Sequence, residues 1–227
     1  MQADRNSLRQ HSLLLANSKF CNSIILDNKT NRRIECKTLH SPAEFTTNTT
    51  NNMTDFKTLV QTRRSHRKFT DEPIDGEAVK LILRAGLMAP TSKSSRAWHF
   101  IVVEDKTDLE KLADAKDLGG AFIKGTSLAV VICASPETTD CWIEDCSIAA
   151  ISMQYQAEEL GIGSCWAQMD KRGLSDGTPA NDVIHGILDI PEEQRVLCVL
   201  GFGHAADDRK PQNEDKLKWE NVHIGKF

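Results

Sequence analysis

A cluster of basic side chains around one serine is the part of this sequence best suited to chemistry. Residues 62–70 read Thr-Arg-Arg-Ser-His-Arg-Lys-Phe-Thr and follow an apolar run that contains Phe56, Leu59 and Val60. An arginine guanidinium is permanently charged and presents a planar fork of donors that matches the oxygens of a phosphate. The segment therefore indicates a phosphate anchor, although a solvated basic helix end would have the same composition.

A second segment suited to ligand binding follows along the chain. Residues 89–100 read Ala-Pro-Thr-Ser-Lys-Ser-Ser-Arg-Ala-Trp-His-Phe, a turn rich in proline and hydroxyl residues that leads into an apolar, strand-like run. Small side chains in such a turn would let a flat ligand lie close to the backbone. Together the two segments predict a phosphate anchor and a ring-binding turn.

The order of these segments resembles the FMN-dependent nitroreductase family. That family has an Arg-Arg-Ser-x-Arg-x-Phe pattern at the end of its first helix, and then an Ala-Pro-Ser/Thr-Ser turn that leads to Trp-x-Phe. The resemblance continues at residues 159–166, Glu-Leu-Gly-Ile-Gly-Ser-Cys-Trp, and at the basic residues 216–223. It spans Met53 to Phe227, about three quarters of the chain.

The resemblance implies a fold, a cofactor and a set of contacts. The fold would be α+β, a three-layer α/β/α sandwich with a small, mainly antiparallel sheet flanked by helices. FMN would carry the chemistry with NADH or NADPH as reductant, so no side chain is assigned a catalytic role. The expected cofactor-binding residues are Arg63, Arg64, Ser65, Arg67, Pro90, Thr91, Ser92, Ser94, Trp166, Ala167, Gln168, Met169, Lys216 and Lys218.

The resemblance also assigns roles within this set. Arg63 and Ser65 would contact the FMN phosphate, and Arg67 would lie toward the ribityl and pyrimidine end of the ring. Residues 90–92 would lie along the ring edge. Residues 166–169 match a segment whose backbone approaches the hydride-accepting nitrogen.

The carboxyl-terminal lysines Lys216 and Lys218 match further phosphate cations of the family, with Arg209 as a possible substitute. The sequence departs from the family at residues 93–97, where Lys-Ser-Ser-Arg-Ala stands in place of Gly-Asn-x-Gln-Pro. This departure leaves the contacts to a partner subunit and the substrate preference open.

By this resemblance the chain is an oxidoreductase that takes a hydride from NAD(P)H and reduces nitroaromatic, quinone or related electrophilic small molecules by a ping-pong mechanism. The same scaffold supports reductive dehalogenation and flavin fragmentation, which remain alternatives. A non-catalytic phosphate- or nucleotide-binding module would also use the basic cluster. The choice between NADH and NADPH stays open because no fixed acid or arginine marks a ribose 2′ position.

Composition limits the partners. The 227 residues carry a net charge of −4, which argues against nucleic-acid binding. No apolar run approaches the roughly 18 residues of a membrane span. The seven cysteines have no metal-like spacing, which favours free thiols in a reducing, cytoplasmic setting, and Cys165 is the one to watch for reactivity. No histidine pair has ligand spacing, so we expect no metal.

A long helix over residues 140–160 is apolar around much of its circumference. A central core helix would explain this pattern, but the family resemblance favours a homodimer with flavin sites at a two-fold interface. In that interpretation Ala150 would lie on the outward apolar face.

Alternating patterns predict the remaining elements. Asp55 and Asp75 would cap the first two helices, a short helix would cover 107–117, and Asn181 would cap the last one. The strand candidates are residues 98–104, 128–134 and 196–201.

Residues 201–206 spell the dinucleotide-binding pattern Gly-x-Gly-x-x-Ala, but only 24 residues follow Gly203. A unit of at least about 30 residues is needed for that fold, so the glycines more simply end a strand. Residues 1–52 are rich in Asn, Thr and Ser without sustained periodicity, and we expect a disordered extension ahead of a natural start at Met53.

Overall fold

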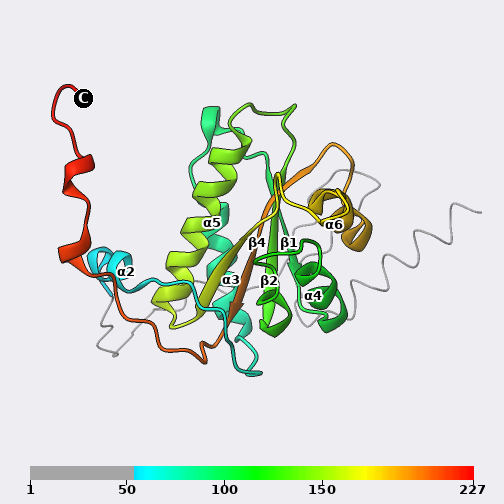
Figure 1. Cartoon of the computed structure of the whole chain (residues 1–227), viewed down its shortest axis with the longest axis horizontal. Coiled ribbons are helices and arrows are strands. Elements are labelled where there is room, and N and C mark those ends of the chain that lie inside the picture. The colour runs from blue at the N-terminus through cyan, green and yellow to red at the C-terminus, as the bar shows by residue number, and fades with distance from the viewer. Residues whose placement is uncertain (1–53) are drawn as a thin grey trace, which may run out of the picture. The chain divides into compact units, whose positions relative to one another are not determined.

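The computed structural model describes residues 54–227, and the expectations for residues 1–52 lie outside that range. The described residues form five α-helices and four β-strands (Figure 1). The helices are α2 (Phe56–Thr62), α3 (Gly76–Leu87), α4 (Lys106–Ala113), α5 (Trp142–Glu159) and α6 (Ala180–Leu188). The strands are β1 (Trp98–Val103), β2 (Leu128–Ala134), β3 (Gly163–Gln168) and β4 (Arg195–Gly203).

The four strands form one antiparallel sheet in the order β1-β2-β4-β3. β2 and β4 lie in the centre, and every residue of β2 is buried. Their continuous apolar runs are typical of strands that are covered on both faces. β1 and β3 are the edges, so each has one side on which another segment can bind.

Two apolar clusters cover the two faces of the sheet. Adjacent residues of β2 point to opposite faces, so Val130 joins the cluster with α3 and α5 while Val131 joins the cluster with α4 and α6. Met153 of α5 and Ile184 of α6 are fully buried in their respective clusters. The predicted three-layer α/β/α sandwich is confirmed.

Local signals fixed the starts of the first two helices as predicted. The Asp55 carboxylate accepts from the Thr58 amide at 2.7 Å, and the Asp75 carboxylate accepts from the Glu77 amide at 3.0 Å. These are ordinary N-cap contacts, which satisfy donors that the first helical turn leaves free.

Strand β3 is not one of the three strands that the sequence predicts. Its sequence, Gly-Ser-Cys-Trp-Ala-Gln, is mostly small and polar, which gives it a low intrinsic preference for the extended state. Pairing with β4 supplies the missing stabilisation, with Trp166 opposite Leu200 and Cys165 opposite Gly201. The neighbouring strand therefore decides this element, and the prediction that Gly201 and Gly203 end a strand is confirmed.

The prediction that Asn181 caps the last helix is wrong. Pro179 occupies the N-cap position and makes no side-chain cap bond. The Asn181 side chain instead accepts from the Val196 amide at 2.8 Å and donates to the Val196 carbonyl at 3.3 Å. Asn181 therefore ties α6 to the start of β4.

The outward face of α5 also differs from the prediction. Ala149 and Ala150 are fully buried against the sheet and α3, whereas Ile148 is 38% exposed. Small residues around the helix made the buried side impossible to identify from spacing alone. Among the described helices, α5 included, none is long and apolar enough to cross a membrane.

Candidate functional site

Ser65 is held at the free edge of β3. It forms a parallel bridge with Ser164, whose carbonyl accepts from the His66 amide at 3.0 Å. Ser164 is itself fixed, because the buried Gln154 of α5 donates to its hydroxyl at 3.2 Å. A Cβ on Gly163 would lie 3.2 Å from the His66 Cβ, so glycine allows this close approach. Backbone contacts therefore place the predicted phosphate-binding serine.

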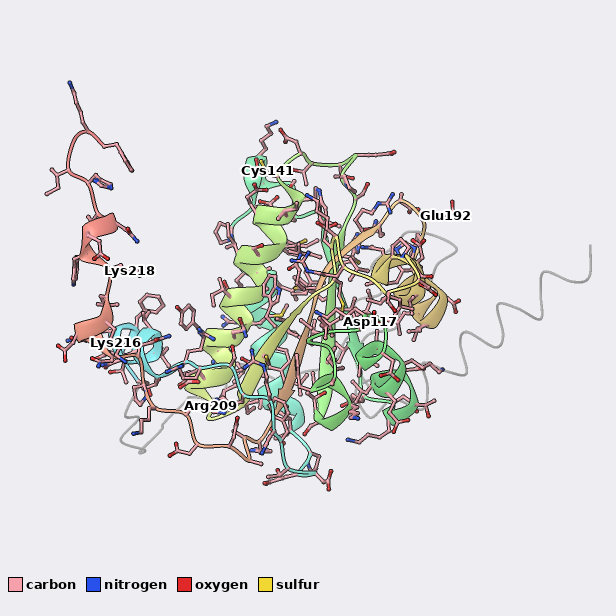
Figure 2. All side chains as sticks on the ribbon, in the orientation of Figure 1. Asp117, Cys141, Glu192, Arg209, Lys216 and Lys218 are labelled. Atoms are coloured by element: carbon pink, nitrogen blue, oxygen red, sulfur yellow. The ribbon has the colours of Figure 1, made fainter. Side chains whose placement is uncertain are left out.

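The chain that leaves β4 returns alongside the basic segment. Residues 204–212 are joined to residues 61–70 by backbone hydrogen bonds, and the Arg64 guanidinium donates to a carbonyl of the returning chain. Lys216 and Lys218 follow further along this chain (Figure 2). These hydrogen bonds hold residues 204–212 beside the basic segment, and the exposed Lys216 and Lys218 lie four and six residues beyond the last of them.

The cations of this region differ in whether they already form a salt bridge. Asp207 lies 2.8 Å from His66 Nδ1 and 2.7 Å from the Arg209 guanidinium. Burial raises the pKa of Asp207, but the hydrogen bonds from His66 and Arg209 outweigh it, so the pKa lies below its usual value. Within residues 54–227, Arg63 and Arg67 make no salt bridge. Arg63 and Arg67 can therefore meet an anion, whereas Arg209 is already paired.

The predicted ring-binding turn lies at the other end of α5. Its 3-10 turn, Ser92–Ser94, is fixed by Asp145, which is 2% exposed. The Asp145 carboxylate accepts from the Ser92 amide at 2.7 Å and from the Ser95 hydroxyl at 3.1 Å. Pro90 and Ser94 are exposed, while Thr91 and Ser92 are half-buried.

Within one chain, the ring-binding turn and the basic segment lie near opposite ends of α5. Asp145 contacts the turn and Gln154 contacts Ser164, and the two residues stand nine positions apart on α5. At a rise of about 1.5 Å per residue, that separation is about 13 Å along the helix axis. The structure therefore brings together the basic segment, β3 and the returning chain, and leaves the turn at a distance.

Residues 166–169 face two environments. Ala167 and Met169 are buried in the cluster with α4 and α6, so only their backbone can reach a ligand. The Met169 amide already donates to a carbonyl of β4 at 2.9 Å. Trp166 and Gln168 are half-buried, and the indole donates to the Gln168 Oε1 at 3.0 Å.

Comparison with known proteins identifies the family. The model of the nitroreductase family matches residues 60–122 and 129–204. The chain belongs to the nitroreductase family. A curated relative from Archaeoglobus fulgidus, named "Putative NADH dehydrogenase/NAD(P)H nitroreductase", is 32% identical over 74% of this chain and 97% of its own length.

Solved structures agree with this nitroreductase fold. An FMN-dependent nitroreductase from Clostridium difficile R20291 is 41% identical, with a TM-score of 0.73 over 74% of this chain and 98% of that chain. The NADPH:FMN oxidoreductase of Vibrio harveyi, solved with NAD+, is 23% identical with a TM-score of 0.64 over 74% of this chain and 76% of its own, and shares the fold.

Lys116 is a buried cation beside the candidate segment 166–169 that sequence reasoning missed. Its side chain is 7% exposed, and its Nζ donates to the Gln168 carbonyl at 2.7 Å. Burial, together with the nearby Arg172 guanidinium, lowers the pKa of Lys116, opposed by the Cys165 thiol. No local signal marked this lysine, because the contact joins residues 52 positions apart.

Cys165, the thiol singled out for reactivity, is 1% exposed. Burial raises the pKa of the Cys165 thiol, and the nearby Arg67 and Ser65 only partly oppose that effect. A buried, protonated thiol behaves as a small apolar side chain. Cys165 therefore packs beneath the candidate site instead of reacting there.

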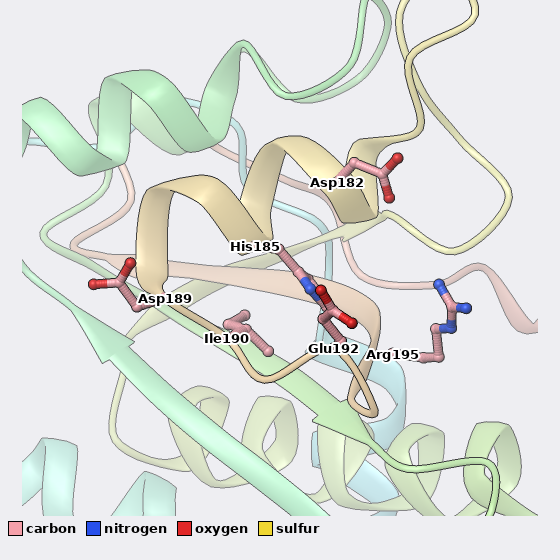
Figure 3. Close-up of a pocket in the computed structure, with 6 residues that line it drawn as sticks. All are labelled: Asp182, His185, Asp189, Ile190, Glu192 and Arg195. Atoms are coloured by element: carbon pink, nitrogen blue, oxygen red, sulfur yellow. The ribbon is translucent and has the colours of Figure 1, made fainter.

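A surface pocket elsewhere contains none of the predicted flavin residues. It lies beside α6 and the start of β4, and has a volume of about 700 Å³ (Figure 3). The lining residues are Asp182, His185, Asp189, Ile190, Glu192 and Arg195. Within residues 54–227 no group of three or more His, Cys, Asp or Glu side chains could hold a metal ion.

Proposed function

We propose that this protein is an FMN-dependent oxidoreductase that takes a hydride from NADH or NADPH and reduces nitroaromatic, quinone or related electrophilic small molecules by a ping-pong mechanism. The observation that carries the proposal is the basic segment of a nitroreductase-family chain, in which Ser65 is fixed at the edge of β3 between Arg63 and Arg67. Both arginines lack a salt bridge within residues 54–227, as a phosphate site requires.

The donors present fit FMN. A buried ammonium has three donors, and one acceptor, the Gln168 carbonyl, is recorded for Lys116. Such a group is stabilised by a further acceptor or negative charge nearby. Lys116 also lies close to Cys165, which in turn is close to Ser65 and Arg67. Donors and positive charge on both sides of Cys165 suit a cofactor that carries a phosphate and ring carbonyls.

The chain's own residues would bind and orient FMN and would polarise its ring. Arg63, Ser65 and one or both of Lys216 and Lys218 would hold the phosphate by charge-assisted hydrogen bonds. Arg67 and Lys116 would place positive charge toward the ring, where negative charge gathers on reduction. Bound FMN supplies the two-electron transfer itself.

We further propose a homodimer in which each flavin site is completed by both chains. Packing α5 antiparallel to its copy about a two-fold axis would bring the turn of one chain toward the basic segment of the other, because the anchors of the two regions lie about 13 Å apart along the same helix. The exposed Ile148 on the outer side of α5 supports this arrangement.

The carboxyl-terminal segment is a second feature that supports a homodimer. It carries several large apolar side chains that are at least half exposed: Leu217, Trp219, Val222, Ile224 and Phe227. Exposed apolar side chains in such number are typical of a surface that another molecule covers. A second copy of the chain, which would also complete the proposed shared site, is the proposed occupant.

The location that we propose is the cytoplasm. Burial raises the pKa of the Cys133 thiol to about 11 and that of Cys146 to about 12, so both thiols pack as neutral, apolar groups. Buried free thiols of this kind suit a reducing compartment.

Absorbance and sedimentation test these proposals. The purified protein should absorb near about 450 nm, as oxidised flavins do, and lose that absorbance on addition of NADH or NADPH without oxygen. A colourless protein that binds phosphate would instead indicate a non-catalytic module. Ile148→Glu should yield monomers and release FMN, whereas the control Leu118→Glu, at a side chain 85% exposed after α4, should change neither. A flavin-containing, active monomer would contradict the shared site.

A further inference from the structure

The turn that follows α3 has a backbone conformation that residues other than glycine rarely adopt. Lys93, Ser94 and Arg96 have φ angles of 52°, 54° and 48°, in the left-handed region. A side chain with a Cβ is strained there. Strain of this kind persists only where surrounding contacts impose it, and it concentrates at functional sites.

Three hydrogen bonds impose this conformation. The buried Asp145 carboxylate holds the Ser92 amide and the Ser95 hydroxyl, and the Thr91 hydroxyl accepts from the Arg96 amide at 3.1 Å. A flexible loop would not need a buried carboxylate to fix it. The contacts therefore hold residues 92–96 in one defined, strained geometry.

The strained geometry presents two cations. Lys93 and Arg96 are both exposed, and neither forms a salt bridge with any residue between 54 and 227. The exposed acids closest in sequence to the anchoring carboxylate, Asp140 and Glu144, make no salt bridge there either. Two unpaired cations on one rigid turn attract an anion and can hold it in a fixed position.

We propose that Lys93 and Arg96 bind an anionic group, a carboxylate or a phosphate, on the substrate that enters beside the flavin. This inference rests on the proposed function, in which the turn of one subunit lies at the flavin of its partner. It names the substrate class: electron donors or acceptors that carry a negative charge next to the reacting ring.

Direct binding tests the charge. The double variant Lys93→Gln/Arg96→Gln removes both cations while keeping a Cβ, and hence the backbone strain, at each position. Benzoate and NADP+ serve as anionic probes and benzyl alcohol as the uncharged one, each titrated against the absorbance of the oxidised flavin. The variant should bind at least one anionic probe about tenfold more weakly, as expected for two partly exposed ion pairs. Benzyl alcohol binding and the control Lys124→Gln, at another exposed lysine, should match the parent.

Turnover distinguishes the two sources of the anion. A loss in kcat/KM for NADPH or NADH, but not for uncharged 1-benzyl-1,4-dihydronicotinamide, assigns the site to the donor's phosphates. A loss for 4-nitrobenzoate, but not for 4-nitrobenzyl alcohol, assigns it to an acceptor carboxylate. The charge-conserving variant Lys93→Arg/Arg96→Lys should recover most of either loss.

Equal losses for charged and uncharged partners, or no loss in either arm, would overturn the proposal. The melting temperature and flavin absorbance of each variant show whether the turn has merely unfolded. If the glutamine variant has unfolded, the charge-conserving variant is compared with the parent instead. If the parent protein holds no flavin, the proposed function and this inference both fail. If it holds flavin and the glutamine variant behaves as the parent, only this inference fails.

Discussion

The basic segment and the strained turn are held in opposite ways. The segment around Ser65 is fixed by backbone pairing, to β3 on one side and to the chain leaving β4 on the other. The turn around Ser94 depends on one buried side chain, Asp145, at the far end of α5. The difference predicts that replacing a cation of the basic segment should change binding alone, whereas replacing the buried Asp145 should change stability.

The largest expected effect is on the turn. Asp145→Ala removes the acceptor of two hydrogen bonds in a buried place, and should lower the free energy of unfolding by about 3 kcal/mol. Urea denaturation measures this change. The neighbouring exposed Glu144 gives the control, since Glu144→Ala should cost less than about 0.5 kcal/mol. Equal effects of the two variants would remove the distinction between the regions.

The basic segment should respond in binding instead. Arg63→Ala should weaken FMN binding by about 1.5–3 kcal/mol, or roughly ten- to a hundred-fold, through loss of a charge-assisted bond. The free energy of unfolding of the FMN-free protein should hardly change. The FMN retained after dialysis, read from visible absorbance, is the measurement, and Arg84→Ala on the exposed side of α3 is the control. Full retention by the Arg63 variant would show that the phosphate lies elsewhere.

Lys116 gives a smaller, pH-dependent effect beneath β3. Burial and Arg172 lower the pKa of Lys116 in the folded protein, below its ordinary value of 10.5. Between the two values the unfolded chain binds more protons, so this lysine makes the parent more stable as pH rises toward 10.5. Lys116→Met should lose that rise, whereas Lys124→Met should keep it.

Stability measured against pH for parent and variants tests this difference. The raised pKa values of Cys133 and Cys146 have the opposite effect in alkali, but are shared by all three proteins and cancel in the comparison. Identical curves for the parent and the Lys116 variant would mean that the ammonium is not desolvated.

The smallest effect is expected from the segment that lies outside both regions. Deleting Met1–Asn52 should leave the melting temperature within a few degrees and the flavin content unchanged, because that sequence lacks a core-forming pattern. Differential scanning calorimetry of the full chain and of the Met53-start chain makes the comparison. A larger drop would show that the segment packs on the remainder.

The sequence alone determined the features that depend on neighbouring residues. Asp55 and Asp75 cap helices because a carboxylate can reach an amide two or three residues away. The apolar runs of β1, β2 and β4 specify strands. The order of the basic segment and the turn led to the nitroreductase family, which the family model confirms. These signals are local, so no knowledge of the fold was needed to interpret them.

The tertiary structure decided everything that joins distant residues. β3 becomes a strand because β4 offers it a partner, and Asn181 leaves the cap position because the Val196 backbone needs both of its polar atoms. Lys116 meets the Gln168 carbonyl across 52 residues, and Asp145 meets the Ser92 amide across 53. Burial and pairing across such separations follow from how the chain folds back on itself, and residue types along the sequence carry no record of it.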